Sequence, residues 1–211
     1  TGDFRTHGHK GAKTSKYLLA NASAEPDGLI MEGTMLGRTE EKVRTEKELL
    51  KDATSLFKDT HGPVFVCQSG QNIDRLVSFY RAAQASGRTL LVDLYVAWVL
   101  KQLSEHRDMS GLPTVKKDPK GIRVFYPHFL KGKQEIAFEF KPSKIDYPEI
   151  ADMQGQYVML VRPTMLTYLQ KLVRQGAELC DGLCVYSQWD GYKNDSRMQK
   201  LLGFMDGHSV E

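Results

Sequence analysis

Short apolar runs alternate with longer amphipathic runs along most of this 211-residue chain. A run of four or five apolar residues bounded by turn residues is typical of a buried strand. By this criterion we predict strands at 29–32, 64–67, 89–92, 122–126, 157–161 and 183–186. Because these runs are mostly apolar and do not alternate regularly with polar residues, they indicate a sheet that is covered on both faces.

The segments between these strands carry helical signals. Apolar residues recur on successive helical turns over 40–58. Asn72 and Asp93 are typical N-cap residues for the segments that follow them, and Gly87 is well placed to end the first of these helices. We therefore predict helices over 40–58, 73–86, 94–106, 163–173 and 195–205.

This alternation predicts an α/β fold with a mainly parallel, doubly wound sheet and helices on both of its faces. The segment 108–157 departs from the alternation, since it is rich in Lys, Pro and Gly. We expect part of this segment to be an exposed excursion and residues 135–140 to form a peripheral strand.

Composition and charge narrow the classes of protein. Hydrophobic residues make up 41% and charged residues 26% of the chain, as is ordinary for a soluble globular protein. The net charge of +3 is too small to indicate nucleic-acid binding by itself, although Lys10, Lys13 and Lys16 form a basic cluster. No run of about 18–20 apolar residues predicts a membrane span and no signal peptide is recognisable. We therefore expect a cytoplasmic location and no membrane partner. Three cysteines, an odd number, argue against a disulfide framework.

Two short motifs carry the strongest functional signal. Gly2-Asp3-Phe4-Arg5 is followed by His7-Gly8, and Glu32, at the end of the first predicted strand, is followed by Gly33-Thr34. The first resembles the fourth motif of the metallo-β-lactamase hydrolase fold. The second resembles motif A of the β-CASP subgroup, which includes enzymes that cut RNA and DNA. The resemblance implies a remnant of a metallo-β-lactamase core over 1–40 and a β-CASP-like α/β domain over 41–211.

The resemblance also implies roles for both acids. Asp3 would bridge two divalent metal ions, with zinc as the expected metal, and such a pair can activate water against a phosphodiester. Glu32 would be the catalytic acid that hydrogen-bonds a histidine beside the metals. The family's His-x-His-x-Asp-His signature is not in this sequence. We therefore expect a fragment of a zinc-dependent nuclease that binds no metal tightly and is inactive alone.

The loop after the predicted strand 64–67 is the candidate substrate contact. Ser69, Gly70 and Gln71 precede a predicted helix N-terminus, where backbone N–H groups can hold a phosphate. The resemblance implies that this loop faces a cleft for RNA or single-stranded DNA. Trp189 and Tyr192 would either stack on a base or pack against the core.

An alternative function stays open at this point. A doubly wound domain can also be a binding or scaffold module without metal chemistry, with its partner at the carboxyl ends of the strands. The sequence leaves the choice between RNA, DNA and other substrates open, and it leaves open whether the chain forms a homodimer.

Overall fold

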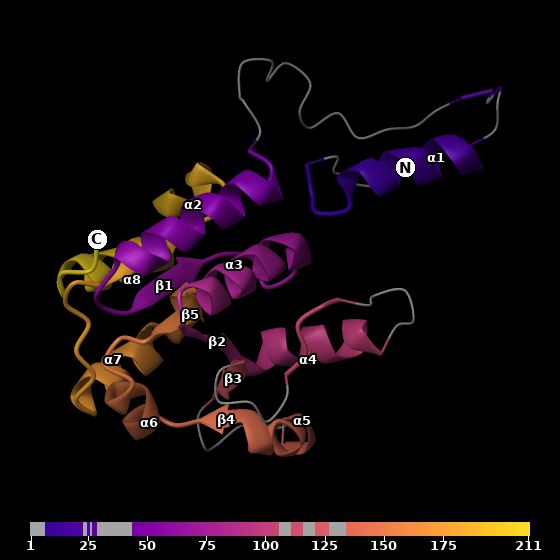
Figure 1. Cartoon of the computed structure of the whole chain (residues 1–211). Helices are drawn as coiled ribbons and strands as arrows, with labels where there is room; N and C mark the ends of the chain where they lie inside the picture. Colours follow the sequence, from indigo (N-terminus) through magenta and orange to yellow (C-terminus); the bar gives the residue numbers. More distant parts are fainter. Residues whose placement is uncertain are drawn as a thin grey trace.

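The computed structural model describes residues 7–22, 25, 27–28, 44–105, 111–115, 121–126 and 134–211. These residues form an α/β fold with a six-stranded, all-parallel sheet (Figure 1). The strands are β1 Val64–Cys67, β2 Thr89–Asp93, β3 Ile122–Phe125, β4 Lys144–Ile145, β5 Tyr157–Val161 and β6 Leu183–Tyr186. Their order across the sheet is β4-β3-β2-β5-β1-β6.

Eight α-helices are found in the described part of the chain, and all but the first cover the two faces of the sheet. They are α1 Gly11–Asn21, α2 Glu46–Asp59, α3 Ile73–Ala85, α4 Leu94–Ser104, α5 Gln134–Glu139, α6 Tyr147–Asp152, α7 Leu166–Arg174 and α8 Ser196–Asp206. One hydrophobic cluster joins the sheet to α2, α3, α4 and the α5 region, and a second joins it to α6, α7 and α8. The prediction of a parallel sheet between two helical layers is thus confirmed.

The central strands show why apolar runs are needed. Every residue of β1, β2 and β5 is buried. Successive side chains point to opposite faces of a strand, so Val64 and Val66 enter one cluster whereas Phe65 and Cys67 enter the other. A strand with a helical layer on each side has no polar face, which is why the pattern in the sequence was continuous.

Side-chain caps fix where the helices begin. Asn72 accepts a hydrogen bond from the backbone of Arg75, and Asp93 accepts one from Val96, so both predicted N-caps are confirmed. The predicted start of α2 near residue 40 is wrong. Thr45 and Glu48 form a capping box, in which each side chain binds the other residue's backbone N–H, and Thr45 itself is extended.

The segment 134–156 also differs from the prediction. Residues 135–140 were expected to be a peripheral strand, but 134–139 form α5, which places Ile136 and Ala137 against the core. The peripheral strand is β4, only two residues long, beside β3. Ile145 and Ile150 are buried, so this part of the expected excursion belongs to the fold. A strand of two residues, one lysine and one isoleucine, is too short to give a signal in the sequence.

The connections diverge at the carboxyl ends of the strands. The loops that follow β1 and β2 enter α3 and α4 on one face, whereas the loop that follows β5 enters α7 on the other face. Because β5 lies between β2 and β1, neighbouring loops diverge there. In open parallel sheets, ligands bind where such loops diverge, at the carboxyl ends of the strands.

The amino-terminal region is described only in part. Helix α1 lies apart from the sheet in Figure 1, and the predicted strand at 29–32 lies outside the described residues. The proposed division at residue 40 therefore stays a prediction. In the described part of the chain, no helix combines the length and the apolar character that crossing a membrane requires.

Candidate substrate-binding edge

The side chains at the carboxyl ends of the strands form two polar clusters, and we call this rim of the sheet the carboxyl edge. It comprises the loops after β1, β2, β5 and β6 together with the first residues of α2, which runs towards the start of β1. One cluster centres on Glu46 and the other on Arg162. Each draws side chains from elements that are far apart in the sequence.

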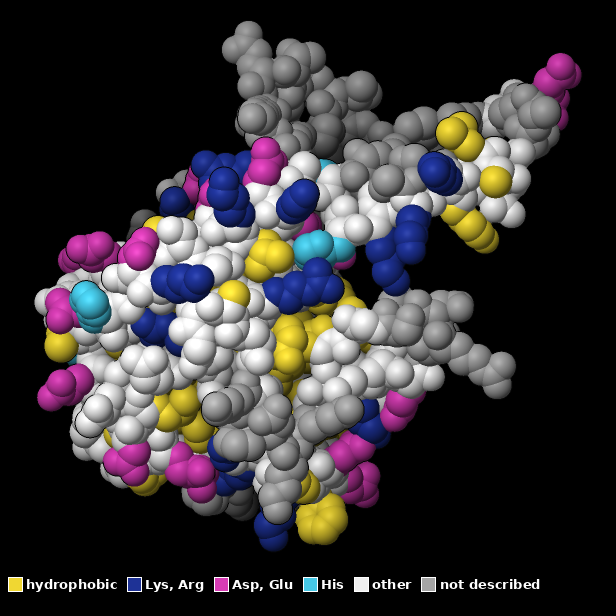
Figure 2. All heavy atoms as spheres, viewed as in Figure 1, with side chains coloured by type: hydrophobic (Ala, Val, Ile, Leu, Met, Phe, Trp, Pro, Cys, Tyr) yellow, Lys and Arg dark blue, Asp and Glu magenta, His cyan; other side chains and the backbone are white. Residues whose placement is uncertain are grey.

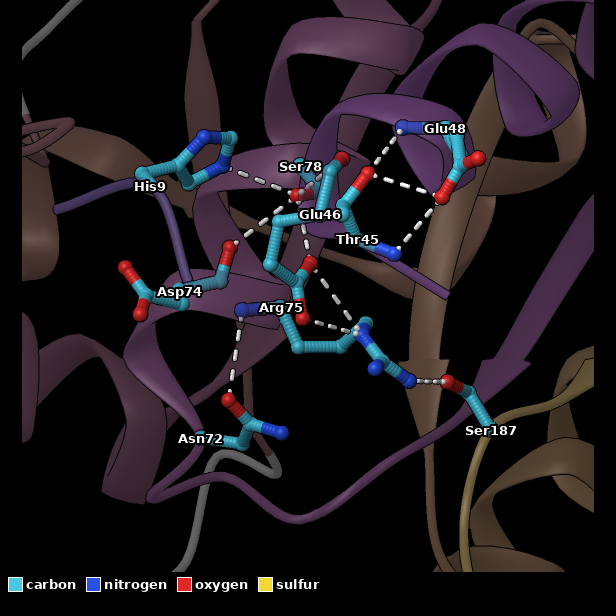
Figure 3. A network of polar contacts seen from close by, with 9 residues as sticks. All are labelled: His9, Thr45, Glu46, Glu48, Asn72, Asp74, Arg75, Ser78 and Ser187. Atoms are coloured by element: carbon cyan, nitrogen blue, oxygen red, sulfur yellow. Dashed lines mark hydrogen bonds and ion pairs between the residues drawn. The ribbon is translucent and has the colours of Figure 1, made fainter. Parts of the chain in front are cut away.

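Glu46 is the centre of the first cluster (Figure 3). Its carboxylate accepts hydrogen bonds from Arg75 Nε at 2.9 and 3.2 Å, and its side chain is only 2% exposed. Arg75 also donates through Nη1 to Ser187 Oγ in the loop after β6. A buried carboxylate is stable only when it is paired, and breaking such a pair typically costs about 3–5 kcal/mol. The pair therefore fixes α2, α3 and the β6 loop relative to one another.

The segment that precedes α1 is attached to this cluster. Ser78 Oγ lies 2.7 Å from Glu46 Oε2 and 2.9 Å from His9 Nε2. A hydroxyl has a single hydrogen, and the carboxylate is the stronger acceptor, so His9 Nε2 donates to Ser78. The backbone N–H of Glu46 also donates to the carbonyl of His7 at 3.1 Å. The residues just after the Gly-Asp-Phe-Arg motif thus lie at the carboxyl edge.

The second cluster joins the loops after β1, β2 and β5. Arg162 forms an ion pair with Asp93, and its guanidinium lies 5.7 Å from the centre of the Tyr95 ring. Tyr95 Oη accepts a hydrogen bond from Gln71 Nε2 at 2.9 Å. A Cβ on Gly70 would lie 3.0 Å from Val96 Cγ2, so glycine lets the loop pack closely on the first turn of α4.

Ser69, Gly70 and Gln71 are placed where the sequence predicted, between a buried strand and a helix N-terminus. Ser69 and Gln71 are exposed. The helix offers fewer free N–H groups than the sequence suggested, because Asn72 already accepts from Arg75 N and Ser69 O accepts from Asn72 N. Substrate binding by this loop stays a prediction, and the capping geometry favours contact through its side chains and exposed backbone.

Gln68 is an unusual residue at the end of β1. It is 6% exposed, and neither atom of its side-chain amide has a hydrogen-bond partner among the residues that the structure describes. Leaving such a group unpaired costs roughly 1–3 kcal/mol per lost partner. Buried amides without partners at a loop junction are a feature of sites that complete their hydrogen bonds with a ligand or water. Gln68 adjoins the loop at 69–71, which supports that loop as a contact surface.

The proposed metal-site residues cannot be placed. Asp3 and Glu32 both lie outside the described residues, and their roles stay predictions from the sequence. Among the residues that the structure does describe, no group of three or more His, Cys, Asp and Glu side chains is arranged to hold a metal ion. The three cysteines are free thiols, and a hydrogen bond with Cys184 together with burial raises the pKa of Cys67.

Two hollows in the described surface lie elsewhere. One, of about 420 Å³, lies at the opposite rim beside Gly62 and Gly155, and another, of about 330 Å³, lies beside Tyr80 and Arg81 on α3. The first is lined largely by the turns that precede β1, β5 and β6. Ligands of parallel sheets bind at the other ends of the strands, so we place the candidate site at the carboxyl edge.

The sequence reasoning found part of this site. It identified the loop at 69–71 and the N-cap Asp93, but it did not single out Arg75 or Arg162. One signal was available in the sequence, since Glu46 precedes Leu50, Ala53 and Phe57 at helical spacing, and a buried acid requires a cationic partner. Which cation would reach it depends on the packing of α2 against α3.

Comparisons with known proteins assign no family or function to this chain. No protein-family model, no curated protein and no solved structure matches this chain.

Proposed function

We propose that this chain is the substrate-binding, β-CASP-like part of a metal-dependent hydrolase of the metallo-β-lactamase superfamily, acting on RNA or single-stranded DNA. In this proposal, residues 41–211 bind the RNA or DNA strand, and residues 1–40 belong to the metal-bearing core. Asp3 and Glu32 would face the scissile phosphodiester in the complete enzyme, with zinc as the expected metal. The chain by itself would bind nucleic acid without cutting it.

One observation carries the proposal. The residues directly after the Gly-Asp-Phe-Arg motif contact the carboxyl edge through His9 and Ser78 and through the His7 carbonyl and Glu46. The motif that would hold metal is therefore adjacent, along the chain, to the rim where an α/β sheet binds its ligands. An unrelated doubly wound module gives no reason for this juxtaposition.

The distribution of charge supports a polyanionic ligand near α1. Lys10, Lys13 and Lys16 are exposed, and no acid in the described residues forms an ion pair with any of them. Figure 2 shows basic side chains along this helix. By contrast, Arg75 and Arg162 are paired with Glu46 and Asp93. Unpaired lysines suit phosphates, because their contacts release counterions without breaking an ion pair.

The test is direct binding of a fluorescently labelled single-stranded oligonucleotide, measured by anisotropy at several salt concentrations. We expect binding that weakens as salt rises. The exchange Gln71→Glu adds a negative charge at the edge and should weaken binding several-fold. The matched control is Gln102→Glu, in the last turn of α4, which should bind like the unmodified chain.

Two results would contradict the proposal. The first is the absence of salt-dependent binding to either RNA or DNA. The second is equal binding by both glutamate variants. Either result would favour the alternative, a binding or scaffold module without metal chemistry, whose partner would then be sought at the same edge with protein and small-molecule ligands.

A further inference from the structure

We infer that Trp189 and Tyr192, in the loop after β6, form a platform on which an unpaired nucleobase stacks. The inference rests on the proposed function and assigns to this loop a part of the binding that the function requires. The two rings lie 5.4 Å apart at an interplanar angle of 89°. We call them the aromatic pair.

The aromatic pair is exposed and does not belong to the hydrophobic core. Trp189 is 62% exposed and Tyr192 is 55% exposed, and neither belongs to either hydrophobic cluster. Large aromatic side chains lose favourable burial when they are left in water, so adjacent exposed rings are typical of binding surfaces. Their faces suit a flat aromatic ligand.

The backbone around the aromatic pair is well fixed. The carbonyl of Trp189 accepts hydrogen bonds from Tyr186 Oη and from Tyr192 N, each at 3.0 Å. The Trp189 ring lies against Gly191, where a Cβ would be 2.2 Å from Cη2 of the indole. A platform that is rigid before binding loses little conformational entropy when a base stacks on it.

The position of the aromatic pair is continuous with the candidate site. Ser187, two residues before Trp189, accepts from Arg75 and donates its backbone N–H to the carbonyl of Cys67 at 2.9 Å. The loop after β6 therefore begins beside the end of β1, where the loop at 69–71 also begins. A single strand that follows the carboxyl edge would pass from one loop to the other.

Base stacking predicts a specific ligand preference. Every base has an aromatic face, so stacking tolerates changes of sequence but requires a base. An abasic oligonucleotide keeps the phosphates and sugars, so it should keep the phosphate contacts but lose the stacking contact with the aromatic pair. A duplex, in which the bases are already stacked and paired, should bind more weakly than a single strand.

The experiment compares variants of the whole 211-residue chain by anisotropy with a single-stranded oligonucleotide. Truncation of a stacking aromatic typically costs about 1–3 kcal/mol per base, so Trp189→Ala should raise Kd roughly 5- to 100-fold. Trp189→Phe should restore most of the affinity. Gly191→Ala should weaken binding although both rings remain, because the indole must move. Phe138→Ala, which removes an exposed ring from α5, is the control and should leave Kd unchanged.

A second readout reports on the ring itself. In a Trp98→Phe background, Trp189 is the single tryptophan of the chain, and its fluorescence should be quenched by the oligonucleotide but not by the abasic strand. The aromatic-pair inference alone is overturned if the unmodified chain binds single strands and Trp189→Ala binds them equally well. It is also overturned if Trp189→Ala changes only self-association in sedimentation. If no single strand binds at all, the proposed function fails together with it.

Discussion

The arginines at the two ends of the strands, the amino edge and the carboxyl edge, have different kinds of partner. At the amino edge, where the strands begin, Arg88 is 4% exposed, and no acid in the described part of the chain pairs with it. Arg88 donates to the backbone carbonyls of Phe57, Thr60, Gly62 and Gly155. At the carboxyl edge, Arg75 and Arg162 bind carboxylates and remain partly exposed. Arg88 therefore links turns of the backbone to one another, whereas Arg75 and Arg162 position side chains at the carboxyl edge.

The glycines differ in the same way. Gly62, Gly155 and Gly182 precede β1, β5 and β6, and a Cβ on any of them would come within 3 Å of a neighbouring backbone atom. Gly155 also has a φ of +80°. At these three positions the amino edge is therefore packed backbone against backbone, which leaves no room for a Cβ. At the carboxyl edge, Gly70 contacts side chains, and residues next to it are exposed.

This difference indicates that residues at the amino edge contribute mainly to stability and exposed residues at the carboxyl edge mainly to binding. We expect substitutions at the amino edge to unfold the protein, and substitutions of exposed carboxyl-edge residues to change binding while leaving the fold intact. Ligands of parallel sheets bind at the carboxyl ends of the strands, so close packing at the amino edge can stabilise the fold without obstructing a ligand.

The largest effect is expected for Arg88→Met. The substitution leaves four backbone carbonyls without their donor, three of them on the buried residues Phe57, Gly62 and Gly155. We therefore expect a loss of about 3–5 kcal/mol in the free energy of unfolding. Chemical denaturation by urea, followed by circular dichroism, measures it. Arg44→Met is the control, since the Arg44–Asp52 pair is exposed and should contribute less than about 1 kcal/mol. A similar small loss in both variants would contradict the structural role of Arg88.

A smaller loss is expected for Gly155→Ala. The new Cβ would lie 2.8 Å from Gly62 C in a backbone conformation that disfavours alanine, so we expect a loss of about 2–4 kcal/mol. Gly176→Ala separates the two causes, because Gly176 has a φ of +94° but open space around it. Its loss should be about 1 kcal/mol, as measured by thermal or urea unfolding. Equal losses would mean that the close packing of the amino edge contributes nothing.

Tyr157→Phe should have a small effect of the opposite sign. The hydroxyl of Tyr157 is buried at the start of β5, and none of the described residues forms a hydrogen bond with it. Its removal should raise the free energy of unfolding by up to about 1 kcal/mol at neutral pH. Because the change in packing is slight, a loss of more than about 1 kcal/mol would show that this hydroxyl has an unseen partner.

The same residue predicts a dependence on alkaline pH. Burial raises the pKa of Tyr157, so above pH 10 the unfolded chain releases this proton while the folded chain retains it. Stability therefore falls as the pH rises above about 10, by up to roughly 1.4 kcal/mol per pH unit for one proton. Urea unfolding at a series of pH values should show a shallower fall for Tyr157→Phe, and parallel curves for the two proteins would contradict the assignment. Tyr126, Tyr147 and Tyr186, whose pKa values are also raised by burial, contribute equally to both curves.

The smallest effect on stability is expected at the carboxyl edge. Trp189→Ala removes a ring that is mostly in water, so the free energy of unfolding should change by less than about 1 kcal/mol. Thermal unfolding measures it, with Phe138→Ala as a second exposed aromatic for comparison. A loss as large as that of Gly155→Ala would place Trp189 with the stabilising residues and remove the contrast between the two edges.

Local signals in the sequence predicted the fold better than the site. The strands β1, β2, β5 and β6 were predicted within one residue, because each is a continuous apolar run with its own turn signals. The caps Asn72 and Asp93 were likewise predictable, since each acts on the backbone of the next three residues. The short strand β4 and helix α5 were not, because two to six residues carry too little periodicity and their packing decides between the states.

What the sequence determined by itself is the class of the fold, since a parallel sheet between two helical layers follows from apolar runs separated by amphipathic segments. The tertiary structure decided which strands are neighbours and therefore which side chains meet. Glu46 and Arg75 are 29 positions apart, and Arg75 and Ser187 are 112 apart. No local pattern encodes such contacts, because they depend on the order β2-β5-β1-β6, which is set by how all the layers pack together.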